Sequence, residues 1–438
     1  MTSIPKPKLH IAMFPYLALG HITPYINLAK ELAKEGHQIS FLLPKKTLGH
    51  FSAKNPYPHL LKFYPLNMPK VDGLPVGAET NSDIDITVST NALDVAIDAM
   101  SVQVEALLYD LKPNIVFYDF ALWIPNLAAK IGFKTVCYHV ICASFLAMGT
   151  VPARHFPKER SLTIEELMET PKGYPSSTVV LRYQEARKLS LMVTNTFDIR
   201  LTSAMQGADA IGIRTCRELE GPMCDYIQTQ FNKPVFLSGP FLPKTLHKLM
   251  ETKWEEWLSK FNPKSFQELV LGFEMTGLPF FVALSKPKGA NSIEEALPEG
   301  FAERVGDRGV VYGGWVEQTK ILNHSSVGCF VSHCGFGSMW ESLLSDTQIV
   351  LVPWLADQIL NTRLLVEELE VAVEVERGEM GWVSKENLCK AIKFAMDEES
   401  EVGKVIKQNH ANYKEILAGP KFMDNYVHNF IASLYGLL

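Results

Sequence analysis

Apolar runs of strand length alternate with helix-period segments from the beginning of this 438-residue chain. The run "LHIAMF" (9–14) is typical of a buried strand, "TPYINLAKELAKEG" (23–36) of an amphipathic helix that ends at a glycine, and "QISFLL" (38–43) of the next strand. Repetition of strand, helix and strand predicts a parallel sheet with helices on both faces. The same order returns in the ranges 114–119, 123–132 and 134–140 and, after an excursion over 151–188, in the strand-like runs 191–196 and 208–215.

A second series of the same kind fills the C-terminal half. Three prolines and a glycine in "KPVFLSGPFLPK" (233–244) favour a linker between the two series. Since single cores stop growing at about 250–300 residues, we expect an α/β protein with two doubly wound, Rossmann-like parallel-sheet domains that face each other across a cleft. The strands of the second series are expected at 279–284, 309–314, 327–333 and 348–353, and the domains at 1–240 and 241–420, followed by a terminal helix over 421–438 that packs back on the first domain.

Composition excludes several classes of function. The formal net charge is −6 and the sequence has no basic cluster, which argues against a nucleic-acid partner. The seven cysteines are scattered without a CxxC pair, which favours reduced thiols in a cytoplasmic protein over disulfides or a zinc site. Charged residues interrupt the most apolar region, 115–150, so no membrane span is predicted, and we expect a monomer.

The stretch "FVSHCGFGSMWES" (330–342) combines residues that suit an anion site. A strand, a glycine-containing turn and a helix start follow one another, and a helix N-terminus directs unpaired N–H groups and a positive dipole end at a ligand. His333 and Ser338 add donors for a phosphate, and Glu341 could accept ribose hydroxyls. A second interpretation stays open, because Ser338 and Glu341 also have the spacing of a capping box.

A longer frame surrounds this motif, from Trp315 to Gln358, and it spans 44 residues. In length and spacing it resembles the signature box of the plant family-1 UDP-dependent glycosyltransferases. Two positions depart from the family pattern: Phe336 stands where Trp is usual and Gly337 where Asn is usual. Such replacements are similar to those of the branch that adds a sugar to a sugar already attached to the acceptor. The matching positions are Trp315, Gln318, His324, His333, Cys334, Gly335, Ser338, Glu341, Pro353, Asp357 and Gln358.

The resemblance implies a GT-B fold, an acceptor-binding N-terminal domain and a C-terminal domain that binds the UDP-sugar. It implies that Trp315 and Gln318 hold the base and ribose, with Val316 beside them. Asp357 and Gln358 would bind the donor sugar. The diphosphate and ribose would be held by His333, Gly335, Gly337, Ser338 and Glu341.

His21 and Asp119 are the candidates for catalysis. His21 lies in the turn after the first strand, and Asp119 ends the strand "NIVFYD", so both are expected at the carboxyl edge of one parallel sheet, where such sheets carry ligands. A carboxylate after an apolar run needs a partner, and an imidazole that it orients suits a general base at neutral pH. The resemblance agrees with this pair, and it implies direct displacement with inversion. UDP-sugar would be a co-substrate, with no cofactor and no metal.

One segment of the family pattern is absent. After "WEEWLSKFNPKS" (254–265) the family has an apolar strand and a Gly-Ser turn that helps bind the diphosphate, whereas this chain continues directly into a helix at Phe266. Roughly 15–20 residues are missing, judged from the usual length of a strand with its loop. Three explanations stay open: the sequence omits a stretch of the protein, the chain is a deleted variant, or another segment such as 233–241 takes the place of the strand.

The leading hypothesis is an inverting UDP-sugar-dependent glycosyltransferase that adds glucose, rhamnose or xylose to a hydroxyl of a plant small-molecule glycoside. The alternative is a protein that binds UDP-sugar but is catalytically impaired by the missing strand and turn. A dinucleotide-dependent oxidoreductase would explain the α/β pattern but not the frame from Trp315 to Gln358.

Overall fold

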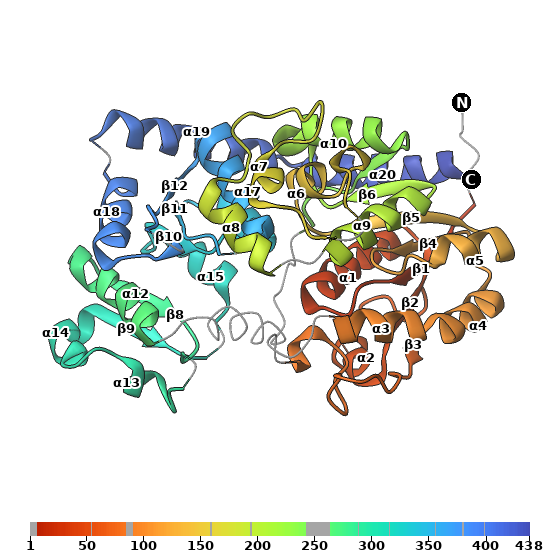
Figure 1. The fold of residues 1–438 in the computed structure, drawn as a ribbon, viewed down its shortest axis with the longest axis horizontal. Helices are drawn as coiled ribbons and strands as arrows, with labels where there is room; N and C mark the ends of the chain where they lie inside the picture. Colours follow the sequence, from red (N-terminus) through yellow and green to blue (C-terminus); the bar gives the residue numbers. More distant parts are fainter. Residues whose placement is uncertain are drawn as a thin grey trace.

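The computed structural model describes residues 7–53, 55–84, 91–157, 160–192, 195–241, 263–287, 289–314, 316–354, 356–378, 381–397 and 399–438. Figure 1 shows two α/β halves side by side, with the first sheet in the N-terminal half and the strands β8–β12 in the C-terminal half. None of the described helices is long and apolar enough to cross a membrane.

The N-terminal half is built on a seven-stranded parallel sheet with the order β3-β2-β1-β4-β5-β6-β7. β1 lies in its interior, with Ile11 in register with Ile39 of β2 on one side and Ile115 of β4 on the other. The strands are β1 (His10–Phe14), β2 (Gln38–Pro44), β3 (Leu61–Leu66), β4 (Ile115–Tyr118), β5 (Lys134–His139), β6 (Ala210–Ile213) and β7 (Val235–Leu237).

Both faces of this sheet are apolar because helices cover both of them. Ile11 and Met13 of β1 belong to one buried cluster, and Ala12 and Phe14, which point the opposite way, belong to another. The helices of this half are α1 (Leu19–Lys34), α2 (Lys45–Ser52), α3 (Asn91–Ala99), α4 (Ser101–Leu111), α5 (Ile124–Ile131), α6 (Ala143–Gly149), α7 (Ile164–Met168), α8 (Tyr183–Met192), α9 (Asn195–Gly207) and α10 (Arg217–Phe231), with 3-10 turns at Asn81–Asp83 and Pro152–Arg154.

The terminal helix α20 (Phe422–Leu437) contributes Val427, Phe430 and Leu434 to the cluster that holds Ile11. The chain therefore returns to the N-terminal sheet at its end, and Figure 1 shows α20 on that side. The exact domain bounds stay a prediction.

The C-terminal half contains two separate groups of parallel strands among its described residues. One has the order β10-β11-β12 and the other is the pair β8-β9. These strands are β8 (Phe280–Ala283), β9 (Gly309–Tyr312), β10 (Cys329–Ser332), β11 (Gln348–Leu351) and β12 (Ala372–Glu374). Their helices are α12 (Pro263–Thr276), α13 (Ile293–Ala296), α14 (Phe301–Val305), α15 (Gln318–Leu322), α16 (Phe336–Leu343), α17 (Ala356–Arg363), α18 (Lys385–Ala395) and α19 (Glu401–Leu417), with a 3-10 turn at Gly306–Arg308 and a π-helical turn at Leu364–Glu368.

A mainly apolar cavity of about 590 Å³ is lined by residues of both groups, including Phe280 and Val282 of β8 and Phe330 and Val331 of β10. No described strand joins β8 to β10. We refer to this cavity as the β8/β10 slot. Its two sides are still held together, because Val282 of β8 and Val350 of β11 share one buried cluster with α12 and α18.

Two sequence predictions about local structure were wrong. The run 191–196, predicted as a strand, contributes the end of α8 and the beginning of α9. Buried residues in these helices recur at helical spacing, Ala186 with Leu189 and Leu201 with Ala204, and this period outweighs the short strand-like run. The range 233–244, predicted as a linker, contains β7, which pairs with β6. Since β7 belongs to the first sheet, residues 235–237 do not replace the missing strand of the second half.

Candidate active site

His21 and Asp119 meet at the carboxyl edge of the N-terminal sheet. The imidazole Nδ1 of His21 lies 2.7 Å from Oδ2 of Asp119. His21 was predicted in the turn after the first strand, but it lies in the first turn of α1. β1 and β4 are neighbours with Phe14 opposite Tyr118, so the sheet brings the start of α1 and the residue after β4 together. The structure therefore places the two predicted catalytic residues in direct contact.

Asp119 is buried and its charge is well supported. The carboxylate is 1% exposed, and its Oδ1 accepts hydrogen bonds from the backbone N–H of Tyr16 at 2.6 Å and of Phe120 at 2.9 Å. His21 keeps a 17% exposed side chain, flanked edge-on by the rings of Tyr16 and Phe120. With Nδ1 donating to the carboxylate, Nε2 is left to accept a proton from a substrate hydroxyl, as in other Asp–His pairs.

A second histidine, His139, ends β5 close to this pair, and sequence analysis did not single it out. Burial, aided by the charge of His21, lowers the pKa of His139 to about 3. Its Nε2 lies 3.3 Å from the Sγ of Cys137, whose thiol in turn contacts the carbonyl of Asp119. His139 thus stays neutral at physiological pH, so of these two histidines only His21 is suited to proton transfer.

In the C-terminal half, Gln318, Ser338 and Glu341 form one buried polar cluster. The amide Nε2 of Gln318 donates to Oε2 of Glu341 at 2.6 Å and to Oγ of Ser338 at 3.3 Å. Gln318 begins α15, and the other two residues lie on α16. Val316 and Gln318 line the β8/β10 slot together with His333. The structure thus brings five predicted donor-site residues (Val316, Gln318, His333, Ser338 and Glu341) to one end of the C-terminal strands.

The helix α16 begins at Phe336, and Gly335 is its N-cap without a side-chain hydrogen bond. Ser338 lies inside the first turn, so the capping-box interpretation of Ser338 and Glu341 is wrong. A Cβ on Gly335 would lie 2.5 Å from Nε2 of His333, which means that the glycine makes room for this imidazole. A Cβ on Gly337 would meet nothing within 4 Å. The helix N-terminus therefore borders open space on the side of Gly337, as an anion site requires.

Asp357 and Gln358 lie in the first turn of α17. Oε1 of Gln358 accepts a hydrogen bond from the backbone N–H of Trp354 at 3.0 Å, which fixes the loop before the helix. Trp315, the predicted platform for the base, lies outside the described residues. Within the described ranges, no group of three or more His, Cys, Asp or Glu side chains is placed to hold a metal ion.

Arg214 is a further buried residue at this site that the sequence did not reveal. It follows β6 and donates from Nε and Nη2 to the carbonyls of Pro240 and Phe241, while its guanidinium faces the ring of Phe336 at 5.8 Å. Burial lowers its pKa to about 10, so it remains charged, and Glu341 is among its electrostatic partners. Arg214 therefore connects the N-terminal sheet to the start of α16.

Comparison with known proteins decides the family. Residues 297–410 match the family model described as "UDP-glucoronosyl and UDP-glucosyl transferase". The chain is 49% identical over 458 aligned positions to anthocyanidin 3-O-glucoside 2'''-O-xylosyltransferase of Arabidopsis thaliana, covering 98% of this chain and 97% of the relative. This chain belongs to the UDP-glycosyltransferases. Another member, UDP-glycosyltransferase 79B3 of Arabidopsis thaliana, is 48% identical over 455 positions. That alignment covers 98% of this chain and 98% of the relative.

Solved UDP-glycosyltransferases share the fold. Apo UGT2 of Phytolacca americana superposes with a TM-score of 0.76 at 20% identity, covering 98% of this chain and 99% of that one. UGT89C1 of Arabidopsis thaliana superposes with a TM-score of 0.74 at 18% identity, covering 98% and 100%. The GT-B fold and the family resemblance are thus confirmed, and the oxidoreductase hypothesis is excluded. The impaired-variant hypothesis has no support among these relatives, all named as transferases.

The alignments also bear on the missing segment. The alignment to the xylosyltransferase spans 458 positions, whereas this chain has 438 residues. At least 20 positions of the xylosyltransferase therefore have no counterpart in this chain. That length agrees with the strand and loop predicted to be absent near Ser265 and Phe266. Both residues lie inside α12 in the structure, and the described residues before them contain no strand of the second half.

Proposed function

We propose that this UDP-glycosyltransferase transfers a glucose, rhamnose or xylose unit from a UDP-sugar to a hydroxyl of a flavonoid or related phenylpropanoid glycoside. The observation that carries the proposal is the 2.7 Å contact between His21 and the buried Asp119. Support for the acceptor class comes from the relative at 49% identity, whose name states a glucoside acceptor, and from Phe336 and Gly337 in the signature frame.

The chemistry follows from the dyad. Nε2 of His21 removes the proton of the acceptor hydroxyl as the oxygen attacks the anomeric carbon, and Asp119 stabilises the imidazolium that forms. A new C–O bond forms while the bond to the UDP oxygen breaks, and the electron pair leaves with UDP. Attack from the side opposite UDP inverts the anomeric configuration.

The donor is held by the C-terminal half in this proposal. The N–H groups at the start of α16, with His333 and Ser338, face the diphosphate, and Glu341 with Gln318 holds the ribose. Asp357 and Gln358 bind the sugar hydroxyls, and Trp315 stacks on the base. Because these groups offset the charge of the departing diphosphate, we propose that no metal is needed. Seven free thiols further favour a cytoplasmic enzyme, which we expect to be a monomer.

The test is turnover with a defined panel. UDP-glucose, UDP-xylose and UDP-rhamnose are each incubated with one flavonoid 3-O-glucoside, and UDP release and product mass are measured. We expect acceptor-dependent UDP release with one of the three donors and a product heavier by one sugar residue. Absence of release with all three donors, while UDP binds, would refute the proposed activity of this chain.

A further inference from the structure

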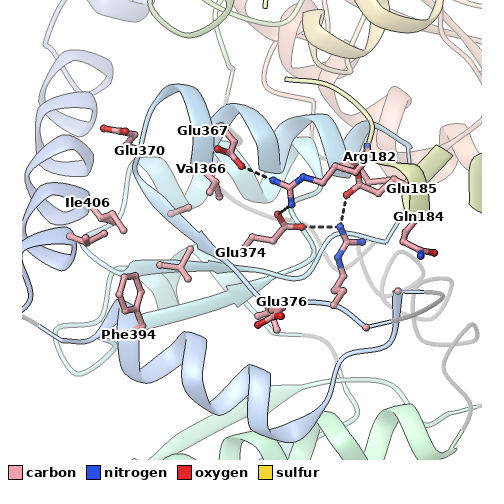
Figure 2. A pocket seen from close by; sticks show the side chains of 18 of the residues that line it. Arg182, Gln184, Glu185, Val366, Glu367, Glu370, Glu374, Glu376, Phe394 and Ile406 are labelled. Carbon is pink, nitrogen blue, oxygen red and sulfur yellow. Dashed lines mark hydrogen bonds and ion pairs between the residues drawn. The ribbon is translucent and has the colours of Figure 1, made fainter. Parts of the chain in front are cut away.

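A cluster of alternating charges joins the helix α8 to the C-terminal strands, outside the site described above (Figure 2). Glu185 of α8 accepts hydrogen bonds from the guanidinium of Arg363, at the end of α17, and from Nη2 of Arg377 at 2.6 Å. Glu185 and Arg363 are 4% and 1% exposed, so this contact is fully desolvated. The two residues are separated by 178 positions in the sequence.

Glu374 of β12 is the second acceptor of the same arginines. Its carboxylate pairs with Arg363 and, at 2.8 Å, with Arg377, and Arg182 lies 3.7 Å away. Burying ions is costly unless each is paired and hydrogen-bonded, and removal of one partner leaves an uncompensated charge. The position of Glu185 is therefore tied to that of Arg363, because Nη2 of the buried guanidinium donates to Glu185 and Nη1 to Glu374.

A cavity of about 770 Å³ lies beside this cluster, and its opposite wall is apolar, formed in part by Phe394 and Ile406. Figure 2 shows the charged side chains pointing toward one another across one side of this cavity. Within the cluster, Arg182 pairs with Glu374, and Arg377 pairs with both Glu185 and Glu374. These charges thus serve the attachment of α8 rather than a ligand in the cavity.

A second attachment lies three residues further along α8. The ammonium of Lys188 lies 3.2 Å from the centre of the Trp354 ring, within cation–π distance. The backbone N–H of Trp354 donates to Gln358, in the first turn of α17. Residues 185 and 188 share a face of α8, so this helix contacts the last residue of α17 through Arg363 and the loop before α17 through Trp354.

We propose that Glu185, with Lys188, is a positioning residue for the donor sugar. The inference rests on the proposed function, in which Asp357 and Gln358 bind the sugar hydroxyls. α8 belongs to the long excursion of the N-terminal half, so the acceptor-binding half sets the position of the sugar-binding turn of the donor-binding half. Loss of the Glu185 charge releases one end of α17 and displaces the turn that faces the sugar.

UDP and UDP-sugar distinguish this role from a merely structural one, because UDP lacks the sugar. For Glu185→Gln we expect the Kd for UDP to stay within twofold of wild type. The Kd for whichever of UDP-glucose, UDP-xylose and UDP-rhamnose the wild type binds most tightly should rise roughly fivefold to tenfold. Lys188→Met, which leaves the buried arginines paired, should shift the same Kd in the same direction by a smaller factor. Both constants are measured by titration calorimetry on the full chain, without acceptor.

The matched control is Glu368→Gln. Glu368 also joins the excursion to the turn after α17, by accepting hydrogen bonds from Thr178 at 2.7 Å and Ser176, but it does so at the exposed edge and away from Arg363. We expect both Kd values unchanged for this variant. The inference is wrong if Glu185→Gln and Lys188→Met weaken UDP and UDP-sugar equally, or if they change neither.

These binding measurements need no turnover, so they separate the two proposals. If wild-type protein binds UDP-sugar but releases no UDP with an acceptor, the proposed activity fails while the positioning role is still decided by the two Kd values.

Discussion

The two halves of this molecule follow one strand order, and among the described residues only the N-terminal half completes it. The N-terminal sheet contains β3-β2-β1-β4-β5-β6, which is the usual doubly wound order 3-2-1-4-5-6. The C-terminal half repeats it as β9-β8, a gap, and β10-β11-β12. The position that β1 fills in the first sheet is the β8/β10 slot in the second. The comparison locates the missing strand at the centre of the sheet, where its loss exposes the most apolar surface of the neighbouring strands.

The difference shows which parts of the site depend on which strand. In the N-terminal half, α1 follows β1 directly and carries His21 in its first turn, in contact with Asp119, so the proposed chemistry depends on the central strand. In the C-terminal half, α16 and α17 follow β10 and β11, and both strands are present. The residues on these helices follow described strands. By contrast, the described residues contain no counterpart of the turn that, by the family resemblance, would help bind the diphosphate. We therefore expect intact chemistry and weakened donor binding.

The largest effect is expected from the dyad of the complete half. Asp119→Asn removes the charge that stabilises the imidazolium of His21, so kcat should fall on the order of 10²–10⁴-fold, with the Kd for UDP unchanged. The control is Asp209→Asn at the opposite edge of the same sheet, where Asp209 accepts from the backbone N–H of Thr135 at 2.9 Å. Equal losses of kcat in both variants would contradict the assignment.

Restoring the missing strand should have the next largest effect. The residues that the 49%-identical relative has opposite the gap are inserted between Ser265 and Phe266. Burial of a central apolar strand should raise the free energy of unfolding by several kcal/mol, measured with urea. It should also slow hydrogen exchange at the amides of β8 and β10. A glycine-serine insert of equal length is the control, and an equal gain from both inserts would mean that the slot does not accept a strand.

The exclusion of water from His139 in the N-terminal half can be tested by pH. The pKa of His139 is lowered to about 3, whereas in the unfolded chain it is about 6.5. Above pH 6.5 the imidazole is neutral in both states, and as the pH falls the unfolded state gains its proton first. Stability is therefore lost between pH 6.5 and 3. Between pH 7 and 5 the wild type should lose about 2 kcal/mol more than His139→Gln, in urea unfolding at both pH values. Parallel losses would show that water reaches this site.

The smallest effect is expected from a valine-to-alanine substitution made once in each half. Val116 of β4 is fully buried beside β1, and Val331 of β10 lines the slot and is only partly buried. Val116→Ala should cost about 2 kcal/mol of unfolding free energy and Val331→Ala less than about 1 kcal/mol, because the second side chain already borders empty space. Similar costs at the two sites would contradict an open slot.

The sequence was sufficient to predict those features that depend on the local pattern of apolar and polar residues. Alternating periods predicted the parallel sheets, and the ends of strands β1 and β4 predicted the meeting of His21 and Asp119. It failed for 191–196, where helical burial outweighed a short strand-like run, and for β7, where prolines concealed an edge strand. Contacts between distant segments, such as Glu185 with Arg363, carry no local pattern. Neutral His139 and buried Arg214 were missed because burial, not residue type, determines their state.

Donor affinity and rate, measured together, test the central claim most directly. This chain and a chain with the restored segment are compared for the Kd of UDP-sugar and for kcat with a flavonoid glucoside. We predict turnover in both chains. Their kcat values should agree within about threefold because the dyad is unchanged, and a threefold ratio is well below the factor of ten that corresponds to about 1.4 kcal/mol. The Kd of UDP-sugar should be lower in the restored chain. Turnover only after restoration, or a large rise in kcat with no change in Kd, would contradict the account.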